Sequence, residues 1–512
     1  MGNTGKNSNV KNNQRKSQKK KNQKARKIIK LIGYILCAIQ FVFSILATLY
    51  VVKLNIVPTS YIVIIDVLLL VLVVFFILLQ KWPVPGVIAS FLSIIISSIL
   101  FLGCFYINFT YKKIRDMSGV DTKIDNVNVY VRADDAAGSI NDAANYNFGI
   151  LTELDRENTN NIIADIESAV GQSISITEYD TVLDLVQGLF ENQTQAMILN
   201  DAYMSFITDT AGFEDAESRI KVIYNKNYES SIKKEVNEEY LNSEGRVFTV
   251  LLNGVDTRGS TIANSNSDTN ILMTVNMDTH QILMISTPRD YFVPLSISGN
   301  VRDKLTHSGA YGVDVTMDTL EMLYGVNIDD YVRINFDGFM DVIDALGGIT
   351  VYSDYEFDGF DNDVVNMTYH FNQGYNELNG KQALLFARER HAFTDGDRQR
   401  GKNQMAVIEG MIDKALSPQI LKNYTNIWSE VSDCVVTSMD YDEIADFVKT
   451  QLSDGTNWNV VKYSVTGTDS SSTTYSTGST EVYVMIPDEE TVNQAREYLR
   501  QIYAGQTVVI PE

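Results

Sequence analysis

Cysteine is scarce in this chain of 512 residues, which contains only three. Cys37 and Cys104 fall within long apolar runs, so Cys434 is the one cysteine outside them. A disulfide within one chain needs two cysteines in the same compartment, so the sequence excludes a disulfide-stapled domain after the apolar runs. We expect that part of the chain to depend on core packing.

Motifs of several common enzyme classes are also missing. The patterns H-E-x-x-H and G-x-x-x-x-G-K-[ST] are absent, which argues against the commonest zinc proteases and nucleotide hydrolases. There is no G-x-S-x-G elbow, so we interpret His307, beside Ser308, as a hydrogen-bonding structural residue rather than part of a nucleophile system. We find no internal repeat and no recognisable helix-turn-helix.

Acidic residues are absent from residues 1–30, which carry eleven Lys or Arg, although the whole chain has a formal charge of -22. Removing the +11 of this tail leaves -33 on the rest, so the remainder is strongly acidic. The tail has almost no aromatic or helical pattern and lies directly against an apolar run. Attraction to anionic lipid and the fixing of topology explain it, and we expect no nucleic-acid partner.

Three long apolar runs cover residues 28–52, 61–79 and 84–109, and each is long enough to cross a hydrocarbon layer of about 30 Å. We therefore predict a multi-pass membrane protein with three transmembrane helices between residues 28 and 109. The basic tail, residues 1–27, should stay cytoplasmic, which places everything after about residue 110 outside the cell. Asp66, inside the second run, is interpreted as a packing residue between helices.

The external part of the chain divides into two α/β units. Residues 121–225 mix short strand-like and helical patterns and are predicted to form a small accessory domain, joined by a polar linker at 226–245. The second unit, residues 246–512, alternates strands with helices, which is typical of an α/β sandwich with a central mixed sheet flanked by helices. Within it, the serine- and threonine-rich stretch 466–480 is expected to be a mobile hairpin loop.

The second unit places charged residues at the ends of predicted strands. Asp256 and Arg258 follow the first strand in "RVFTVLLNGVDTRG", at the strand edge where ligands of open α/β sheets usually bind. A predicted hairpin, "NILMTVNM" and "QILMISTP", turns at residues 278–280. Asp268 precedes its first strand and Arg289-Asp290 follow its second, so the hairpin can bring an acid and an Arg-Asp pair to one edge.

The stretch "FARERHAFTDGDRQRGKNQ" at 386–404 is strongly basic for so acidic a chain. If residues 386–390 are extended, Arg388 and Arg390 point to the same face. Arg400 and Gln404 share one face near the start of the next predicted helix. This set could converge on one anion, because guanidinium groups and helix N-termini bind phosphate oxygens. A solvated face of salt-bridged arginines is the alternative.

Residues 247–418 resemble the LytR-CpsA-Psr family of cell-envelope proteins. The matching stretches are "LLNGVDTRG", "SDTNILMTVN", "STPRDYFV", "DKLTHSGAYG", "YVRINFDGF", "VIDALGGITVY", "LNGKQALLFARER" and "GDRQRGKNQ". Three membrane spans and an extra external domain before the catalytic one resemble the CpsA branch. The resemblance implies an enzyme that cleaves a polyprenyl pyrophosphate and transfers its glycopolymer, of the capsule or teichoic acid type, onto peptidoglycan through a phosphodiester.

The resemblance also implies roles for individual residues. Asp268 corresponds to the Mg²⁺-binding aspartate, with Asp256 beside it as second ligand and as our choice of catalytic base. The residues that bind the pyrophosphate would be Arg289, Asp290, Arg388, Arg390, Arg400 and Gln404. Asn266 departs from the family, which commonly has arginine two residues before the metal aspartate. Either Arg258 or Arg398 would replace that arginine, or the protein would bind that end of the pyrophosphate more weakly.

The expected partners are the polyprenyl-linked glycan, peptidoglycan, membrane lipid, and proteins that assemble capsule or wall polymers. The lipid chain needs a groove, for which Val332, Ile334, Phe336 and Phe339 are candidates, although such residues are more often plain core. A different class of function also fits the sequence. In this alternative the chain is a membrane-bound sensor or regulator of envelope polysaccharide synthesis that binds polyprenyl phosphate lipids without transferring anything.

Overall fold

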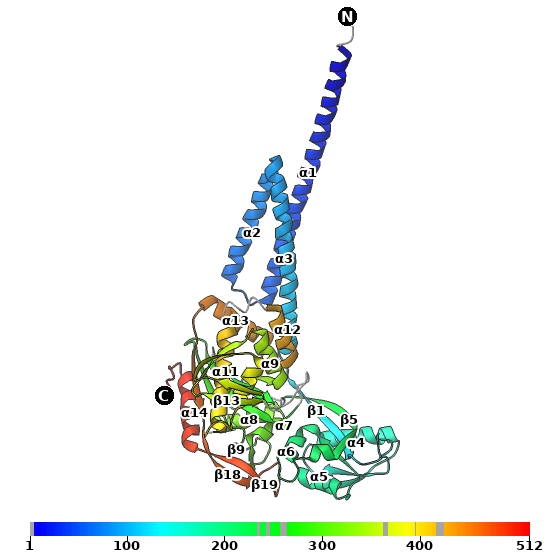
Figure 1. Cartoon of the computed structure of the whole chain (residues 1–512), viewed down its shortest axis with the longest axis vertical. Coiled ribbons are helices and arrows are strands. Elements are labelled where there is room, and N and C mark those ends of the chain that lie inside the picture. The colour runs from blue at the N-terminus through cyan, green and yellow to red at the C-terminus, as the bar shows by residue number, and fades with distance from the viewer. Residues whose placement is uncertain are drawn as a thin grey trace. The chain divides into compact units, whose positions relative to one another are not determined.

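A computed structural model describes residues 5–232, 236–241, 246–255, 264–361, 367–394, 396–415 and 424–511 (Figure 1). Its contacts divide the chain into two compact units. One extends to Asp116 and includes residues 440–456, and the other comprises residues 117–439 and 457 onward. Asp256 and Arg258, two of the expected site residues, lie outside the described residues.

The first unit contains three helices that are long and apolar enough to cross a membrane: α1 (Gly5–Leu54), α2 (Thr59–Leu79) and α3 (Pro83–Met117). The basic tail, as far as it is described, continues the first apolar run as one helix. Thr48 Oγ1 donates to Asp66 Oδ1 at 2.6 Å, so the one carboxylate within α2 is hydrogen-bonded to α1. This contact agrees with the interpretation of Asp66 as a packing residue. Helix α13 (Tyr441–Asp454) also belongs to this unit.

The second unit begins with an accessory domain built on a five-stranded sheet, ordered β3-β2-β4-β1-β5. Its elements are β1 (Thr122–Arg132), β2 (Asn147–Leu151), α4 (Arg156–Val170), β3 (Ser175–Tyr179), α5 (Val182–Phe190), β4 (Ala196–Asn200), α6 (Met204–Thr208) and β5 (Ile220–Ser231). Strand β1 is antiparallel to both neighbours, whereas β2 is parallel to β3 and β4. The expected linker starts at residue 226, but β5 stays paired with β1 as far as Ser231.

The rest of the second unit is organised on a six-stranded mixed sheet, ordered β16-β11-β6-β7-β8-β17. Its strands are β6 (Val247–Val255), β7 (Ser267–Asn276), β8 (Gln281–Thr287), β11 (Asp330–Asn335), β16 (Val435–Thr437) and β17 (Asn459–Ser464). The predicted hairpin is confirmed, because β7 and β8 pair antiparallel from Asn270–Thr287 to Asn276–Gln281. Strands β11 and β17 run parallel to their neighbours β6 and β8, so the sheet is mixed as expected.

Helices pack on both faces of this sheet, as the α/β sandwich prediction requires. One face packs its apolar residues with α8 (Val313–Tyr324) and α14 (Glu489–Tyr503). The other packs with α9 (Phe336–Ala345), α10 (Gly380–Arg388), α11 (Asp397–Ala415) and α12 (Tyr424–Cys434). Val332 and Ile334 of β11 contact this second cluster, whereas Tyr331 contacts the first, because successive side chains of a strand alternate.

The hairpin expected in the polar stretch 466–480 is confirmed. Residues 467–473 form β18, which pairs with β19 (Glu481–Pro487). Thr474, Ser476 and Thr477, in the turn that follows, are each at most 3% exposed. Their hydroxyl groups are hydrogen-bonded within the protein, which is why a stretch of polar residues is ordered here.

Asp155 makes the stability of the accessory domain sensitive to pH. The pKa of its carboxyl is raised from 3.8 to about 6. Burial is the largest cause, a hydrogen bond from Asn200 lowers the pKa in part, and the negative charge of Asp125 also raises it. The unfolded chain ionises Asp155 near pH 4, whereas the folded chain keeps the proton until about pH 6. The contribution of Asp155 to stability is therefore present below pH 4 and is lost as the pH rises through 6.

We expect Asp155→Asn to remove this loss, which is at most about 3 kcal/mol. Asparagine also tolerates the positive φ of 54° at this position. Thermal unfolding of the full-length protein between pH 4 and 7.5 measures the effect as a difference between wild type and variant that grows with pH. Asp142→Asn, which changes an exposed carboxylate of the same domain, is the matched control. An identical pH dependence in wild type and Asp155→Asn contradicts the prediction.

Candidate active site

A charged pocket lies where β7 begins, β8 ends and α11 begins. The residues that line it are Asp268, Ser286, Thr287, Pro288, Arg289, Asp397, Arg398, Arg400, Gly401, Gln404, Ser464 and Val465. The hairpin explains how Asp268 and Arg289 meet. Asn270 pairs with Thr287 at one end of the β7–β8 ladder. Asp268 and Arg289 each lie two positions beyond this pair, so both emerge at the same edge of the sheet. The expectation that this hairpin gathers an acid and an arginine is confirmed.

Arg289 is the centre of the charges in this pocket. Its Nη1 lies 2.7 Å from Asp268 Oδ1, and its Nη2 lies 3.2 Å from Asp209 Oδ2. Its Nε lies 3.9 Å from the carboxylate of Asp290. Burial alone would lower the pKa of Arg289, but these carboxylates and Asp397 raise it above its ordinary value. Arg289 is therefore a permanent cation whose charge is shared among several acids.

Helix α11 brings a second group of charges to the pocket. Arg400 and Gln404 lie one turn apart and both line it, as their spacing predicts. Arg400 Nη2 lies 2.6 Å from Oδ1 of Asp397, the first residue of the helix. A Cβ atom at Gly401 would lie 2.5 Å from Ser286 Oγ, so glycine lets α11 approach the end of β8 closely. The close approach at Gly401 and the ion pair with Asp397 together place the guanidinium of Arg400 beside β8.

Asp397 is a partly buried acid of this site. Burial raises the pKa of its carboxyl, Arg400 lowers it, and the negative charge of Asp290 raises it again. The net shift is upward, although Arg289 and Arg390 also favour the charged form. Carboxylates are therefore crowded around this pocket, and additional positive charge there would stabilise them.

Arg388 and Arg390 do not line the pocket. Helix α10 extends to Arg388, so the expected extended conformation of residues 386–390 is wrong for its first three residues. The capping box at Asn379 starts this helix, and Leu385 O still accepts the backbone N–H of Glu389. Both arginine side chains are exposed, and the Arg388 guanidinium stacks over the Phe336 ring at 4.3 Å. Their predicted role in binding pyrophosphate stays a prediction.

Asn266, where the family commonly has arginine, contacts the accessory domain. Ser205 Oγ in α6 donates to Asn266 Oδ1 at 2.9 Å. Of the two arginines considered as replacements, Arg398 lines the pocket, whereas Arg258 lies outside the described residues. Asp290, expected to bind substrate, instead has its carboxylate 3.3 Å from Lys304 Nζ and is buried.

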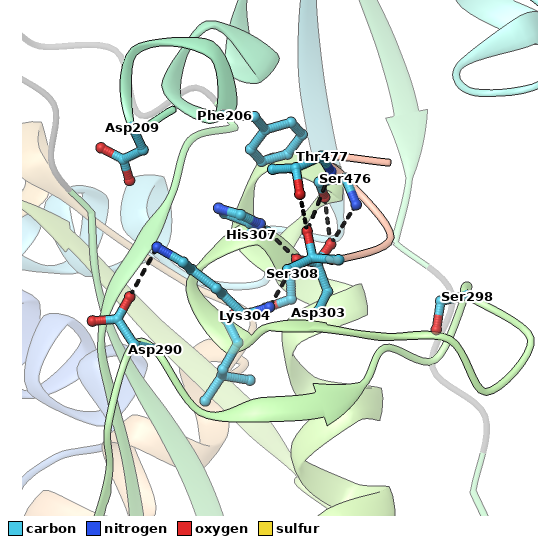
Figure 2. A network of polar contacts seen from close by, with 12 residues as sticks. Phe206, Asp209, Asp290, Ser298, Asp303, Lys304, His307, Ser308, Ser476 and Thr477 are labelled. Carbon is cyan, nitrogen blue, oxygen red and sulfur yellow. Dashed lines mark hydrogen bonds and ion pairs between the residues drawn. The ribbon is translucent and has the colours of Figure 1, made fainter. Parts of the chain in front are cut away.

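His307 belongs to a buried polar network next to the pocket (Figure 2). Its Nδ1 lies 2.7 Å from Asp303 Oδ1, and Ser476 donates its hydroxyl to the other carboxylate oxygen. Burial would raise the pKa of Asp303, but His307, Ser476 and a backbone N–H hold it below its ordinary value. Ser308 instead donates to Leu305 O at 2.6 Å. Ser476 bonds Asp303 and Ser308 bonds a backbone carbonyl, so neither serine is hydrogen-bonded to His307. These residues therefore do not form a hydrolase triad.

Three charged residues of this region were not identified from the sequence. Asp397 could have been found, because it opens the helix that carries Arg400. Lys304 lies in the "DKLTH" stretch but gives no signal of the pairing with Asp290. Asp209 belongs to the accessory domain, more than fifty positions before Asp268, and nothing in the sequence indicates that the two would share Arg289.

We expect Asp209→Asn to tighten the binding of inorganic pyrophosphate by up to about fivefold. Asp209 competes with an anion for Arg289 Nη2, and partly exposed ion pairs contribute up to about 1 kcal/mol. Isothermal titration of the full-length protein measures the dissociation constant. Asp134→Asn, which breaks an ion pair with Arg132 in the same domain, should leave it unchanged. Weaker binding in Asp209→Asn would mean that Asp209 orients Arg289 instead of competing for it.

Comparison with known proteins gives relatives that match about two fifths of the chain. The chain is 36% identical over 200 residues to the polyisoprenyl-teichoic acid--peptidoglycan teichoic acid transferase TagU of Bacillus licheniformis, which covers 39% of this chain and 62% of the relative. It is 35% identical over 223 residues to the TagU of Enterococcus faecalis, covering 43% of this chain and 70% of the relative. The matched segment thus spans less than two thirds of the first relative.

Two solved structures are similar to about half of the chain. The crystal structure of Bacillus subtilis TagV matches with a TM-score of 0.42 and 27% identity, covering 52% of this chain and all of the other. TagT bound to LI-WTA matches with a TM-score of 0.39 and 26% identity, covering 51% and 91% of the two chains. The LytR_cpsA_psr family model matches residues 214–500, which is more than half of the chain. With its hairpin of Asp268 and Arg289 and its helix of Arg400 and Gln404 inside that match, this chain belongs to the LytR_cpsA_psr family.

Proposed function

We propose that this protein is a membrane-anchored phosphotransferase. It would transfer a glycopolymer from a polyprenyl pyrophosphate carrier onto peptidoglycan through a phosphodiester bond. The observation that carries the proposal is the convergence of Arg289, Arg398 and Arg400 with Asp268 in one pocket. The relatives named as teichoic acid transferases support the same chemistry. The glycan is a capsule or teichoic acid polymer, and peptidoglycan supplies the acceptor hydroxyl.

In the proposed reaction the oxygen of the acceptor hydroxyl attacks the phosphorus that carries the glycan. The bond from that phosphorus to the bridging oxygen breaks, and polyprenyl phosphate leaves with the bridging oxygen. The hydroxyl proton passes to a base, for which Asp256 remains our prediction. Arg289 and Arg400 face the oxygens on which negative charge accumulates, and because they are fixed by neighbouring acids they need little reorganisation.

Mg²⁺ is the cofactor that we propose for this site. Among the described residues no group of three or more His, Cys, Asp or Glu could hold a metal ion without further ligands. Mg²⁺ usually takes one or two carboxylates together with phosphate oxygens and water, so Asp268 and a pyrophosphate form a suitable donor set. Asp256 would be the second carboxylate. When bound, the metal neutralises charge on the phosphate oxygens.

The three apolar helices support membrane anchoring. We propose that the basic residues in the N-terminal half of α1 keep the N-terminus in the cytoplasm and that the pocket faces the outside of a Gram-positive-type envelope. In this location the site meets a lipid-linked donor at the membrane and peptidoglycan beyond it. Proteins that assemble capsule or wall polymers would be its further partners.

Arg400→Ala should lower the turnover number by about 10²- to 10³-fold, the cost typical of losing a donor aimed at developing charge. The assay uses the full-length protein in lipid nanodiscs, a polyprenyl-pyrophosphate-linked oligosaccharide, Mg²⁺ and peptidoglycan fragments, and it detects the glycan–peptidoglycan product. Lys402→Ala, an exposed cation on the same helix, is the matched control and should keep full activity.

The sensor alternative is tested by the same assay. Binding of the lipid by the wild type without any product, with peptidoglycan present, would contradict the transferase proposal and favour a sensor. Equal activity of Arg400→Ala and wild type would instead contradict the assignment of the pocket.

Asp268→Asn should raise the Mg²⁺ concentration needed for half-maximal turnover, because one carboxylate ligand is lost. Removing divalent cations with a chelator should stop the wild-type reaction, and added Mg²⁺ should restore it. Asp278→Asn, at the exposed turn of the same hairpin, is the control. Turnover that continues in the chelator would rule out the metal.

A further inference from the structure

A second cavity of about 260 Å³ lies in the same unit and shares no lining residue with the active-site pocket. It is lined by Val120, Thr122, Lys123, Ile124, Ile232, Asn264, Val313, Tyr331, Arg333, Ser432, Cys434, Val435 and Val436. Its walls come from β1, from Ile232 just after β5, and from α8, β11, α12 and β16. Three steps across the sheet separate β11 from β8, which is roughly 14 Å at the usual strand spacing.

Arg333 is the unusual residue of this cavity. It is 4% exposed, and its hydrogen bond from Nη1 to Asn264 Oδ1 is long, at 3.5 Å. Its Nε and Nη2 are buried and have no hydrogen-bond partner in the part of the chain that the structure describes. Burial lowers the pKa of this guanidinium to about 10, so it remains charged at neutral pH.

The neighbouring charges do not compensate Arg333. Asp314 is the carboxylate that acts on it from α8, but Lys123 Nζ engages both oxygens of Asp314, at 3.0 and 2.9 Å. Lys123 also donates to Tyr311 O. On β11 itself, Tyr331 donates its hydroxyl to Val120 O. Asp314 and Tyr331 are thus both engaged elsewhere, and Nε and Nη2 of Arg333 have no partner among the described residues.

A buried charge without a partner costs several kcal/mol, and a hydrophobic residue of similar size would make the fold more stable. The two unpaired groups, Nε and Nη2, form the edge of a guanidinium that binds a carboxylate or a phosphate bidentately. Ile124, Val313 and Val436 are among the apolar residues of the remaining walls, and Thr122, Lys123 and Ser432 add polar groups. The cavity has space for roughly nine waters at about 30 Å³ each, which is the size of a small molecule.

We propose that this cavity binds a small amphiphilic anion, whose single negative head group pairs with Nε and Nη2 of Arg333 and whose short apolar part fills the rest. The head group is a carboxylate or a phosphate monoester, and both offer the oxygen pair that the guanidinium edge needs. This site is separate from the transferase pocket and does not depend on the function proposed for it.

The test measures the unfolding temperature of the full-length protein in nanodiscs of phosphatidylcholine with four probes. These are hexanoate, hexyl phosphate, hexanol and inorganic phosphate. We expect hexanoate or hexyl phosphate to raise the unfolding temperature of the wild type, hexanol to raise it less, and the stronger of the two anions to identify the head group. Arg333→Met should abolish the anion-dependent rise, whereas Arg500→Met, which alters an exposed arginine, should keep it.

Two further readouts keep the test decisive. Without any probe, Arg333→Met should unfold at a higher temperature than wild type, because the uncompensated charge is gone, whereas a purely structural arginine would give a lower one. If Arg333→Met does not fold, Arg333→Lys keeps the charge but loses the bidentate edge, and it should weaken binding at least tenfold. The absence of any anion effect in wild type overturns the proposal. So does a rise that survives in Arg333→Met or Arg333→Lys but disappears in Arg400→Ala, because such binding belongs to the active site.

Discussion

The contact between Arg289 and Asp268 is the constraint on which the active site depends. Two antiparallel strands end at the same edge, and their flanking residues meet there at 2.7 Å. Because the cation is buried, it needs carboxylates around it, and these acids fix its position before any substrate arrives. The same acids keep the pocket from being strongly basic. An anion that enters the pocket must therefore compete with these acids for the arginines, and a divalent cation would relieve that competition.

The accessory domain takes part in this arrangement through α6. Phe206 of α6 packs on His307 with ring centroids 4.6 Å apart (Figure 2). Ser205 and Asp209, on either side of Phe206 in the chain, contact Asn266 and Arg289. A single short helix thus carries one apolar contact flanked by two polar ones. The apolar contact holds the helix in place, and the polar contacts connect it to the charged pocket. In this family member a domain outside the six-stranded sheet supplies a partner to Arg289.

Local patterns in the sequence were enough to predict much of this architecture. The three apolar helices, the β7–β8 hairpin and the shared face of Arg400 and Gln404 all follow from short-range periodicity. Contacts between residues distant in the chain could not be predicted that way. Asp209 meets Arg289 only through the packing of two domains, and Arg333 is recognisable as unpaired only once its neighbours are known. Helix α10 continues to Arg388 because local hydrogen bonds and its capping box outweigh the strand-like pattern expected there.

The buried hydroxyl groups of Thr474, Ser476 and Thr477 have a consequence for proteolysis. A stretch so rich in serine and threonine is ordinarily a favoured place for cleavage, because proteases bind extended, solvated backbone. Here Ser476 offers both its backbone N–H and its hydroxyl to Asp303, and the turn is closed by further bonds between threonines. A protease could reach this turn only after the pairing of Asp303 with His307 and Ser476 had opened. Resistance of the stretch to digestion therefore reports whether the network beside the active site is intact.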